Sequence, residues 1–328
     1  MRAFVTGGSG FIGGKLIARL VADGNAVRAL ARSHRSAEAI AALGGQPIRG
    51  DLGDRAALKV GAADCELAFH AAAKVEDWGP WEDFERDNIE GTRNVASACA
   101  AAGVRRLVHV STEAVLIAGE PLVEVDEQTP RRPDSKAFYP RSKALAEEAV
   151  LAGDAPLERV VVRPRFVWGA GDRTLLPQIA AMVRAGRFAW IGGGRQLTDT
   201  THVANVVHGL LLAAERGGDR EVYFVTDGDR VVFREFVSEL IRTQGLEPPS
   251  RSVPAPVAEA IAAGSEEAWR YLPLPGRPPL TRFAAWVSSQ ECTIDISKAR
   301  DGLGYEPAVA RADGLAELRE ESAKRYSP

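Results

Sequence analysis

Residues 6–13 read Thr-Gly-Gly-Ser-Gly-Phe-Ile-Gly, and this stretch decides the fold. An apolar run of β-branched and aromatic residues at 2–5 comes before it. Residues 11–22 follow, with apolar side chains at helical spacing that stop at an Asp-Gly pair. Strand, glycine turn and helix in this order predict the start of a βαβ unit.

The glycines of this turn predict a dinucleotide site. One glycine allows the tight turn, one lets the backbone approach a pyrophosphate, and one permits close packing of helix on strand; they are Gly7, Gly10 and Gly13. At the helix start, the N–H groups around Phe11 and Ile12 are free to bind phosphate. A glycine turn without a ligand is the alternative, and its position between strand and helix disfavours it.

Strand and helix patterns alternate through the first half of the chain. Strand patterns lie at residues 26–30, 47–49, 67–70, 106–110 and 159–162, and helical patterns at 36–43, 55–60, 88–102 and 139–151. Such alternation predicts an α/β fold, a doubly wound parallel sheet with helices on both faces. A βα-barrel fits less well, because its phosphate site lies late in the chain.

The second half has a different character. Residues 177–186 look helical and residues 200–216 look like strand then helix, but prolines punctuate the chain from 248 to 279, where we expect irregular structure. We therefore expect a dinucleotide-binding domain at 1–165, with a return to the sheet around 199–226. A smaller, mostly C-terminal substrate-binding lobe would take 166–198 and 227–328.

Composition excludes several classes of protein. A net charge of −3, without any block of like charge, gives no sign of a nucleic-acid partner. The cysteines Cys65, Cys99 and Cys292 are odd in number and match no metal-binding spacing, so we expect buried free thiols and no metal. The sequence shows no signal-peptide pattern and no apolar stretch of bilayer length, and we expect a cytoplasmic protein without a membrane span.

The end of the second predicted strand bears on the choice of dinucleotide. NAD-specific sites usually place a carboxylate there for the adenosine ribose, but here Arg32 and Ser33 follow the strand, and Glu38 is the first carboxylate. An arginine pairs well with a 2′-phosphate. We therefore expect NADP(H) in preference to NAD(H), the alternative being that Arg32 and Arg35 are solvated surface charges.

Two further strand ends supply candidate cofactor contacts. Asp51 follows the third strand, where it would accept a hydrogen bond from adenine or cap the next helix. Ala71, Ala72 and Ala73 follow the fourth strand, where small side chains leave room for ribose and nicotinamide or simply pack. The residues alone do not separate these alternatives.

A tyrosine and a lysine suggest chemistry. Tyr139 and Lys143 stand four apart on a predicted helix, which puts both on one face. A neighbouring ammonium lowers the pKa of a phenol and so prepares it for proton transfer. Ser111 and Thr112 end the strand before this helix, where a hydroxyl could donate to a substrate carbonyl or merely satisfy the loop backbone.

These motifs together resemble the extended short-chain dehydrogenase/reductase family, the NAD(P)-dependent epimerase/dehydratase superfamily. Within it the chain is most similar to the 3β-hydroxysteroid dehydrogenase and 2-alkyl-3-oxoalkanoate reductase group. The matching stretches are 6–13, 51–52, 70–79, 88–92, 110–112, 139–143, 163–169, 274–283 and 295–305.

The resemblance implies an NAD(P)-binding Rossmann fold, cofactor contacts that include Leu52 and Pro164, and a homodimer. It also implies that Tyr139 is the acid/base, that Thr112 polarises the carbonyl, and that Lys143 binds ribose. Two residues depart from the family pattern: Pro140 restricts Tyr139 to the first turn of its helix, and Glu113 stands where a small or apolar residue is expected.

The substrate is predicted to be apolar, a secondary alcohol or ketone such as a steroid or a 2-alkyl-3-oxoalkanoate. Trp78, Glu113 and Arg165 are candidate substrate contacts, and the aromatic residues of the lobe would form apolar walls or the lobe's own core. A sugar-nucleotide epimerase or dehydratase is the first alternative, although Thr198 stands where such enzymes carry an arginine. A non-catalytic dinucleotide sensor is the second.

Overall fold

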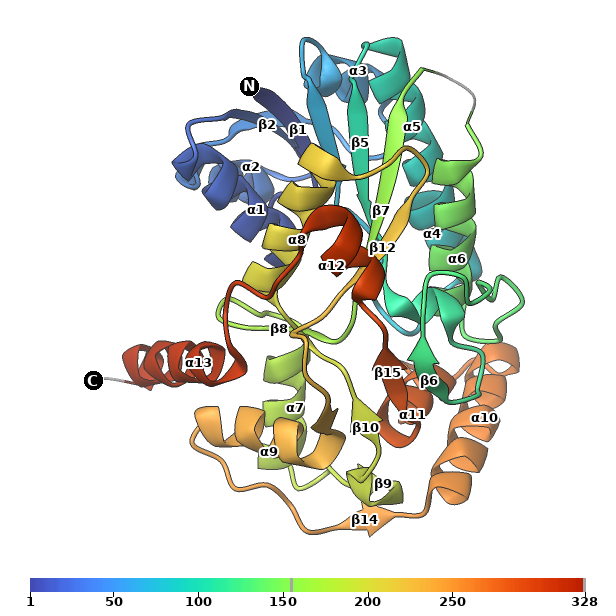
Figure 1. Ribbon diagram of the computed structural model, residues 1–328. Coiled ribbons are helices and arrows are strands. Elements are labelled where there is room, and N and C mark those ends of the chain that lie inside the picture. The colour runs from blue at the N-terminus through green and yellow to red at the C-terminus, as the bar shows by residue number, and fades with distance from the viewer. Residues whose placement is uncertain (154–155, 327–328) are drawn as a thin grey trace.

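The computed structural model describes residues 1–153 and 156–326. A seven-stranded parallel sheet in the order β12-β7-β5-β4-β1-β2-β3 forms its upper half (Figure 1). Its strands are β1 (Arg2–Thr6), β2 (Ala26–Ala31), β3 (Gln46–Arg49), β4 (Leu67–His70), β5 (Arg106–Val110), β7 (Glu158–Pro164) and β12 (Val222–Val225). The strand order reverses beside β1, and ligands of doubly wound sheets bind at such a point.

Helices cover both faces of this sheet, so the predicted α/β doubly wound fold is confirmed. One face carries α1 (Phe11–Ala22), α2 (His34–Ala42) and α8 (Val203–Arg216), and α1 and α8 lie side by side (Figure 1). The other face carries α3 (Arg55–Ala62), α5 (Gly91–Ala101) and α6 (Phe138–Leu151). Apolar residues such as Leu16, Leu58 and Val95 are fully buried between helix and sheet.

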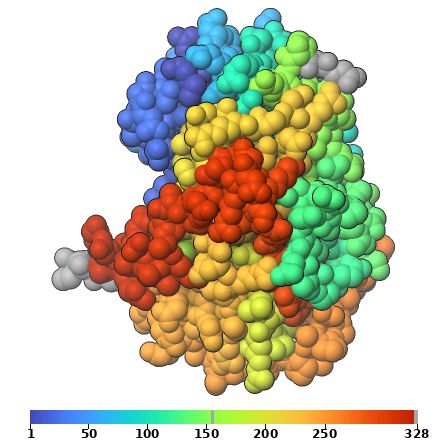
Figure 2. Space-filling view, in the orientation of Figure 1, coloured from blue at the N-terminus to red at the C-terminus, as the bar shows by residue number. Residues whose placement is uncertain are grey.

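Most of the smaller elements lie beyond the carboxyl edge of the sheet, in the lower half of Figure 1, whereas α4 (Trp81–Phe84) lies beside α6 and α12 (Ser297–Leu303) beside α8 and β12. The short strands are β6 (Leu122–Val125), β8 (Val167–Trp168), β9 (Trp190–Ile191), β10 (Leu197–Thr198), β11 (Thr201–His202), β13 (Val231–Val232), β14 (Ser252–Val253) and β15 (Cys292–Ile294). The helices are α4 (Trp81–Phe84), α7 (Leu175–Arg184), α9 (Phe233–Thr243), α10 (Ala255–Tyr271), α11 (Arg282–Ser289), α12 (Ser297–Leu303) and α13 (Arg311–Tyr326). Figure 2 shows the C-terminal segment lying across the middle of this face of the molecule.

A buried carboxylate joins the two halves. Asp227, just after β12, accepts hydrogen bonds from the indole of Trp168 at 2.8 Å, the hydroxyl of Thr200 at 2.7 Å and the backbone N–H of His202 at 2.6 Å. The amide of Asn205 on α8 donates to the same carboxylate at 2.8 Å. This set of bonds fixes the lobe strands β8 and β11 against the last strand of the sheet.

The region expected to be irregular contains a long helix, and that expectation was wrong. α10 (Ala255–Tyr271) begins directly after Pro254, and Pro256 lies in its first turn. Proline has no N–H to lose there, and its fixed φ suits a helix start. The prolines therefore mark where the helix begins. Helices α9 and α13 were not expected from the sequence either.

The long helix expected at 88–102 is divided. Residues Glu85–Glu90 form a π-helical segment that passes into α5 at Gly91. Such one-turn widenings are frequent at functional sites because they redirect a side chain. Among the described residues, no helix is both long and apolar enough to cross a bilayer.

Candidate active site

The glycine turn after β1 is packed so closely that side chains cannot enter it. Gly7 has a positive φ of 75°, and a Cβ there would lie 2.6 Å from the backbone nitrogen of Ala72. A Cβ on Gly13 would lie 2.2 Å from the carbonyl oxygen of Gly7. Both positions require glycine, because even a methyl group would overlap the backbone.

The start of α1 has the character of a phosphate site. Gly10 occupies the N-cap, and no side chain caps the helix. The N–H groups around Phe11 and Ile12 open the helix, where its dipole favours an anion. The N-terminus of α1 has no side-chain cap, and the glycine turn before it has no room for side chains. Both features suit the binding of the pyrophosphate of a dinucleotide.

The residues expected at the adenosine end lie around the ends of β2 and β3. Arg32 is exposed directly after β2, while the hydroxyl of Ser33 accepts the N–H of Ser36 at 3.1 Å and so caps α2. Asp51 is exposed and accepts the N–H of Gly53 at 2.8 Å. The cap of α3 is Asp54, so a capping role for Asp51 was wrong.

The other predicted cofactor contacts pack around the glycine turn and the sheet edge. Ala71, Ala72 and Ala73 are half-buried after β4, beside Gly7. Leu52 packs so closely on Gly91 that a Cβ there would lie 2.8 Å from the leucine side chain. Pro164 is the buried last residue of β7.

Two buried histidines lie near the ends of β4 and β5. The Nδ1 atom of His70 lies 2.6 Å from the hydroxyl of Thr6, and its Nε2 atom lies 2.9 Å from the hydroxyl of Thr92. Its ring centroid is 5.1 Å from that of His109, its partner on β5. Burial lowers the pKa of His70 to about 3 and that of His109 well below the usual range, so both rings are neutral.

The π-helical segment places an asparagine where it supports the candidate tyrosine. Asn88 exchanges hydrogen bonds with the backbone of Lys74, at 2.7 and 3.0 Å, and donates to the hydroxyl of Ser142 at 2.8 Å. Ser142 in turn donates to the carbonyl oxygen of Tyr139 at 2.9 Å. The loop after β4 and the start of α6 are thereby held together.

Tyr139 lies in the first turn of α6, as the following proline requires. Its ring packs against Phe283 of α11 with centroids 5.3 Å apart, and its hydroxyl is hydrogen-bonded to Thr112. Burial raises the pKa of Tyr139 above its usual range and the carboxylate of Glu113 raises it further, while the hydrogen bond with Thr112 acts in the opposite direction. The lowered pKa expected from the sequence was wrong.

Lys143 lies one turn further along α6 and is buried. Its ammonium donates to the carbonyl oxygen of Val110 at 2.9 Å. Burial lowers the pKa of Lys143 to about 8, and the carboxylate of Glu147 acts against that shift. The lysine is therefore close to the point at which it exchanges protons in neutral solution.

Ser111 and Thr112 differ in what they contact. The hydroxyl of Ser111 donates to Glu147 at 2.7 Å, so Ser111 is directed to the buried carboxylate, and its predicted catalytic place is not supported by this geometry. The hydroxyl of Thr112 donates to Glu113 at 2.7 Å and accepts the N–H of Ala114 at 3.2 Å. Of the two hydroxyls, only that of Thr112 meets Tyr139.

Glu113 and Arg165, both predicted as substrate contacts, bind each other. The Nη1 atom of Arg165 lies 2.5 Å from Glu113 Oε1, and its Nε and Nη2 atoms donate to the hydroxyl of Thr198 at 3.3 and 3.1 Å. Both charged side chains are at most 5% exposed. Each nitrogen of the guanidinium thus has a protein partner, and a role of Arg165 or Glu113 in substrate binding stays a prediction.

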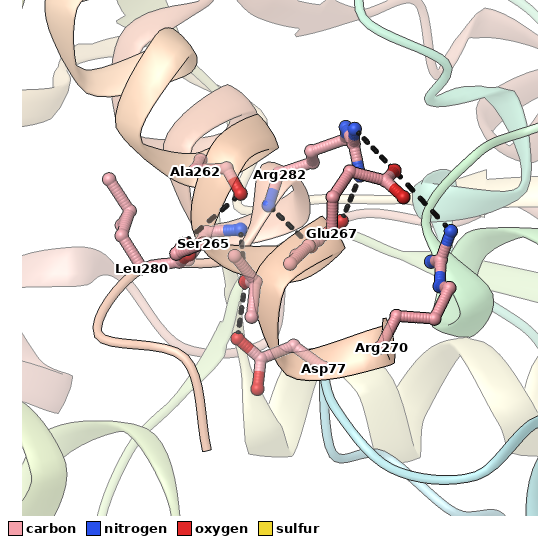
Figure 3. Close-up of polar contacts among 10 residues, drawn as sticks. Asp77, Ala262, Ser265, Glu267, Arg270, Leu280 and Arg282 are labelled. Atoms are coloured by element: carbon pink, nitrogen blue, oxygen red, sulfur yellow. Dashed lines mark hydrogen bonds and ion pairs between the residues drawn. The ribbon is translucent and has the colours of Figure 1, made fainter. Parts of the chain in front are cut away.

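The lobe closes over the tyrosine through contacts with the loop after β4. Asp77 accepts hydrogen bonds from Arg277 and, at 2.7 Å, from Thr281, the N-cap of α11. Arg282 binds Glu267 at 3.0 Å on the α10 side of the same junction (Figure 3). These contacts place Phe283 against Tyr139. Trp78 is half-buried in the loop.

Sequence reasoning missed Glu147. This carboxylate is fully buried on α6, where it pairs with Arg163 at 2.5 Å and accepts from Ser111. Burial alone would raise the pKa of Glu147, but Arg163 outweighs burial and holds it below its usual range. The signal was available, since residues 139, 143 and 147 repeat every four positions and share one helix face.

Comparisons with known proteins agree with this geometry. The chain is 47% identical over 98% of its length, and 96% of the relative's, to the 4-hydroxy-2-methyl-3-oxo-4-farnesyl-3,4-dihydroquinoline-1-oxide ketoreductase of Stigmatella aurantiaca. It is 37% identical over 98% of its length, and the whole of the relative's, to the 2-alkyl-3-oxoalkanoate reductase of Stenotrophomonas maltophilia (strain K279a). The solved structure of MoeE5 in complex with UDP-glucose and NAD superposes with a TM-score of 0.75 over the whole of both chains, at 26% identity.

The family follows from these findings. The sequence model of the 3-beta hydroxysteroid dehydrogenase/isomerase family matches residues 4–255, which include the glycine turn, Tyr139 and Lys143. The expected resemblance and the expectation of an enzyme are confirmed. This chain is a nicotinamide-dinucleotide-dependent oxidoreductase acting on hydroxyl or keto groups, and it belongs to the 3-beta hydroxysteroid dehydrogenase/isomerase family.

Proposed function

We propose that the protein reduces a ketone of an apolar substrate to a secondary alcohol with NADPH, using Tyr139 as the proton donor. The observation that carries this proposal is the half-buried side chain of Tyr139, hydrogen-bonded to Thr112, one helical turn before the buried Lys143. Its raised pKa keeps the phenol protonated, which is the form that a carbonyl oxygen needs when it gains hydride.

The residues around the glycine turn and Tyr139 would each have a separate role. The turn at Gly7–Gly13 would hold the pyrophosphate, and the bound nicotinamide supplies the hydride. Lys143 would bind the ribose hydroxyls and stabilise charge beside the phenol. Tyr139 would donate its proton to the substrate oxygen, and the wall formed by Phe283 would exclude water from that oxygen.

Arg32 supports a preference for NADPH. It is exposed at the end of β2, and Ser33 beside it uses its hydroxyl for the helix cap. An unpaired guanidinium at this position suits a 2′-phosphate by charge and by its fork geometry. The next carboxylate along the chain, Glu38, lies 3.2 Å from His34.

An apolar substrate is supported by the residues on the lobe side and by the relatives. Phe283, Trp286 and Val287 of α11 are half-buried and pack against the core beside Tyr139. The ketoreductase of Stigmatella aurantiaca acts on a farnesylated quinoline, and the Stenotrophomonas maltophilia enzyme on 2-alkyl-3-oxoalkanoates. We propose a substrate of that kind, with a ketone beside a bulky apolar group.

Turnover assays test the proposal. Purified protein is mixed with NADPH or NADH and a panel of farnesylated quinoline ketones, 2-alkyl-3-oxoalkanoates and 3-oxosteroids, and loss of the reduced cofactor's absorbance is followed. We expect oxidation of NADPH with at least one class, and none with Tyr139→Phe. Turnover of UDP- or GDP-sugars by protein that retains its cofactor would overturn the proposal in favour of an epimerase or dehydratase.

A charge-reversal pair tests the coenzyme preference. Arg32→Glu should lower kcat/KM for NADPH about tenfold or more relative to NADH, because it removes a charge-assisted contact to phosphate. Arg35→Glu is the matched control, since Arg35 is also exposed but lies within α2. Equal effects of the two substitutions would contradict the assignment of Arg32.

A further inference from the structure

The hydroxyl of Thr112 has one proton, and Glu113 and Tyr139 compete for it. A threonine hydroxyl offers one donor and two acceptor positions. Its donor is used on Glu113 Oε2 at 2.7 Å, and one acceptor position takes the N–H of Ala114 at 3.2 Å. The hydroxyl of Tyr139 is the further hydrogen-bond partner of Thr112. While the proton of Thr112 is used on Glu113, Tyr139 is left as the donor in this contact, and the contact can lower the pKa of Tyr139 only when Thr112 turns its proton to the phenolate.

We propose that Glu113 is a positioning residue that takes the proton of Thr112 and thereby keeps Tyr139 in the proton-donating form that ketone reduction requires. The proposal rests on the proposed function, in which Tyr139 delivers the proton. For the phenolate to form and be stabilised, Thr112 would have to turn its proton away from Glu113. Glu113 therefore opposes the ionisation of Tyr139 through Thr112 as well as by its own charge.

Arg165 fixes Glu113 for this role. One nitrogen of its guanidinium binds the carboxylate oxygen that Thr112 does not use, and two others bind Thr198. A carboxylate held by a permanent cation can only accept hydrogen bonds. Because both side chains are buried, the carboxylate cannot turn to solvent for another donor.

The other charged or titratable groups near the pair come from several elements. Lys143 lies one turn along α6 from Tyr139 and is bound to Val110. Cys292 on β15 and Asp199 after β10 face Arg165 from the lobe. From α11 the contact with Tyr139 is Phe283, which carries no charge. Glu113 is therefore the carboxylate with direct access to the hydroxyl that Tyr139 contacts.

The test is the pH dependence of alcohol oxidation by the holoenzyme with NADP⁺. The rising limb of log kcat/KM reports the ionisation of Tyr139 as the base. In Glu113→Gln the limb should move to lower pH by about one unit, because the charge is removed and the amide oxygen of glutamine is a weaker acceptor for the proton than a carboxylate. The falling limb of ketone reduction should move to lower pH as well, because Tyr139 loses its proton sooner. Glu120→Gln, an exposed carboxylate in the following loop, is the matched control and should leave the limb in place.

Glu113→Gln leaves Arg165 without its partner and could fail to fold. The double variant Glu113→Gln with Arg165→Met removes both charges and should show the same shift of the limb. An unshifted limb in whichever of these variants folds would overturn the proposal.

A second readout does not need turnover. The phenolate absorbance of cofactor-free protein is titrated with pH, and the Tyr139→Phe titration is subtracted so that Tyr139 alone is seen. Its phenolate should appear at lower pH in Glu113→Gln than in wild type. Equal signals at every pH at which both proteins stay folded would overturn the proposal, while a shift without ketone turnover would retain the proposal's geometry and refute the proposed function.

Discussion

Two buried glutamate–arginine pairs flank the end of β5, and they act on different catalytic candidates. Ser111 donates to Glu147, which pairs with Arg163. Glu147 lies one turn after Lys143 on α6. Thr112 donates to Glu113, which pairs with Arg165 and faces Tyr139. Successive residues of an extended chain point to opposite sides, so one dipeptide serves both pairs.

Both carboxylates act to raise the pKa of the neighbouring group, but their effects on its charged form are opposite. The charge of Glu147 favours the ammonium form of Lys143, whereas the charge of Glu113 disfavours the phenolate form of Tyr139. Both effects retain protons on the site. The comparison teaches that the same pairing of side chains can maintain a cation in one place and a neutral acid in another.

The largest effect is expected from removing the acid itself. Tyr139→Phe should lower kcat for ketone reduction by about 10²–10⁴-fold, because general acid catalysis is lost while the ring contact with Phe283 remains. Stopped-flow or steady-state assays measure the loss, and NADPH binding followed by fluorescence is the control. Substantial residual activity would mean that another group delivers the proton.

The largest loss in the free energy of unfolding is expected from replacing Glu147. Glu147→Gln leaves Arg163 buried without a full counter-charge and should cost about 3–5 kcal/mol in the free energy of unfolding. Urea denaturation measures this loss. Glu148→Gln is the matched control, since its side chain is 42% exposed and its ion pair with Arg131 spans 3.9 Å. Similar losses in both variants would show that Glu147 has no special structural weight.

Lys143 predicts a pH dependence of stability. Its folded-state pKa of about 8 lies below the ordinary value of 10.5, so between these pH values the unfolded chain binds one more proton than the folded one. The stability of wild type should therefore rise with pH across this window relative to Lys143→Met, by on the order of a few kcal/mol. Chemical denaturation at several pH values measures the difference. Parallel pH profiles of the two proteins would contradict the lowered pKa.

The smallest effect is expected from replacing Arg131, the second arginine that contacts Glu147. Arg131 lies 3.2 Å from Glu147 but is 29% exposed, so solvent screens the interaction. Arg131→Ala should cost about 0.5–1 kcal/mol of unfolding free energy. A loss as large as that of Glu147→Gln would mean that Arg131, rather than Arg163, dominates the pair.

Part of this site was predictable from the sequence because it depends on local spacing. The turn at Gly7–Gly13 follows from the order strand, glycines, helix, and Tyr139 and Lys143 share a face by their spacing on a helix. The seven-stranded sheet follows from the alternation of patterns.

The remainder depends on contacts between distant segments. Arg165 meets Glu113 only because β7 lies beside β5 in the sheet, and no local pattern records which side each side chain takes. The direction of the shift in the pKa of Tyr139 likewise depends on burial under α11. Helix α10 was missed because prolines break a helix in its interior but are tolerated in its first turn.

The neutral histidines near Lys143 simplify how the charge of the site depends on pH. With the pKa of His70 near 3 and that of His109 far below normal, neither imidazole gains charge in the weakly acidic to neutral range. These two imidazoles therefore leave the charge near the lysine unchanged where most histidine-bearing pockets change theirs. A bend in a pH–rate curve over that range comes from other groups, such as Asp199, whose pKa burial raises to about 6, or from substrate or cofactor, and bends at higher pH report on Lys143 or Tyr139.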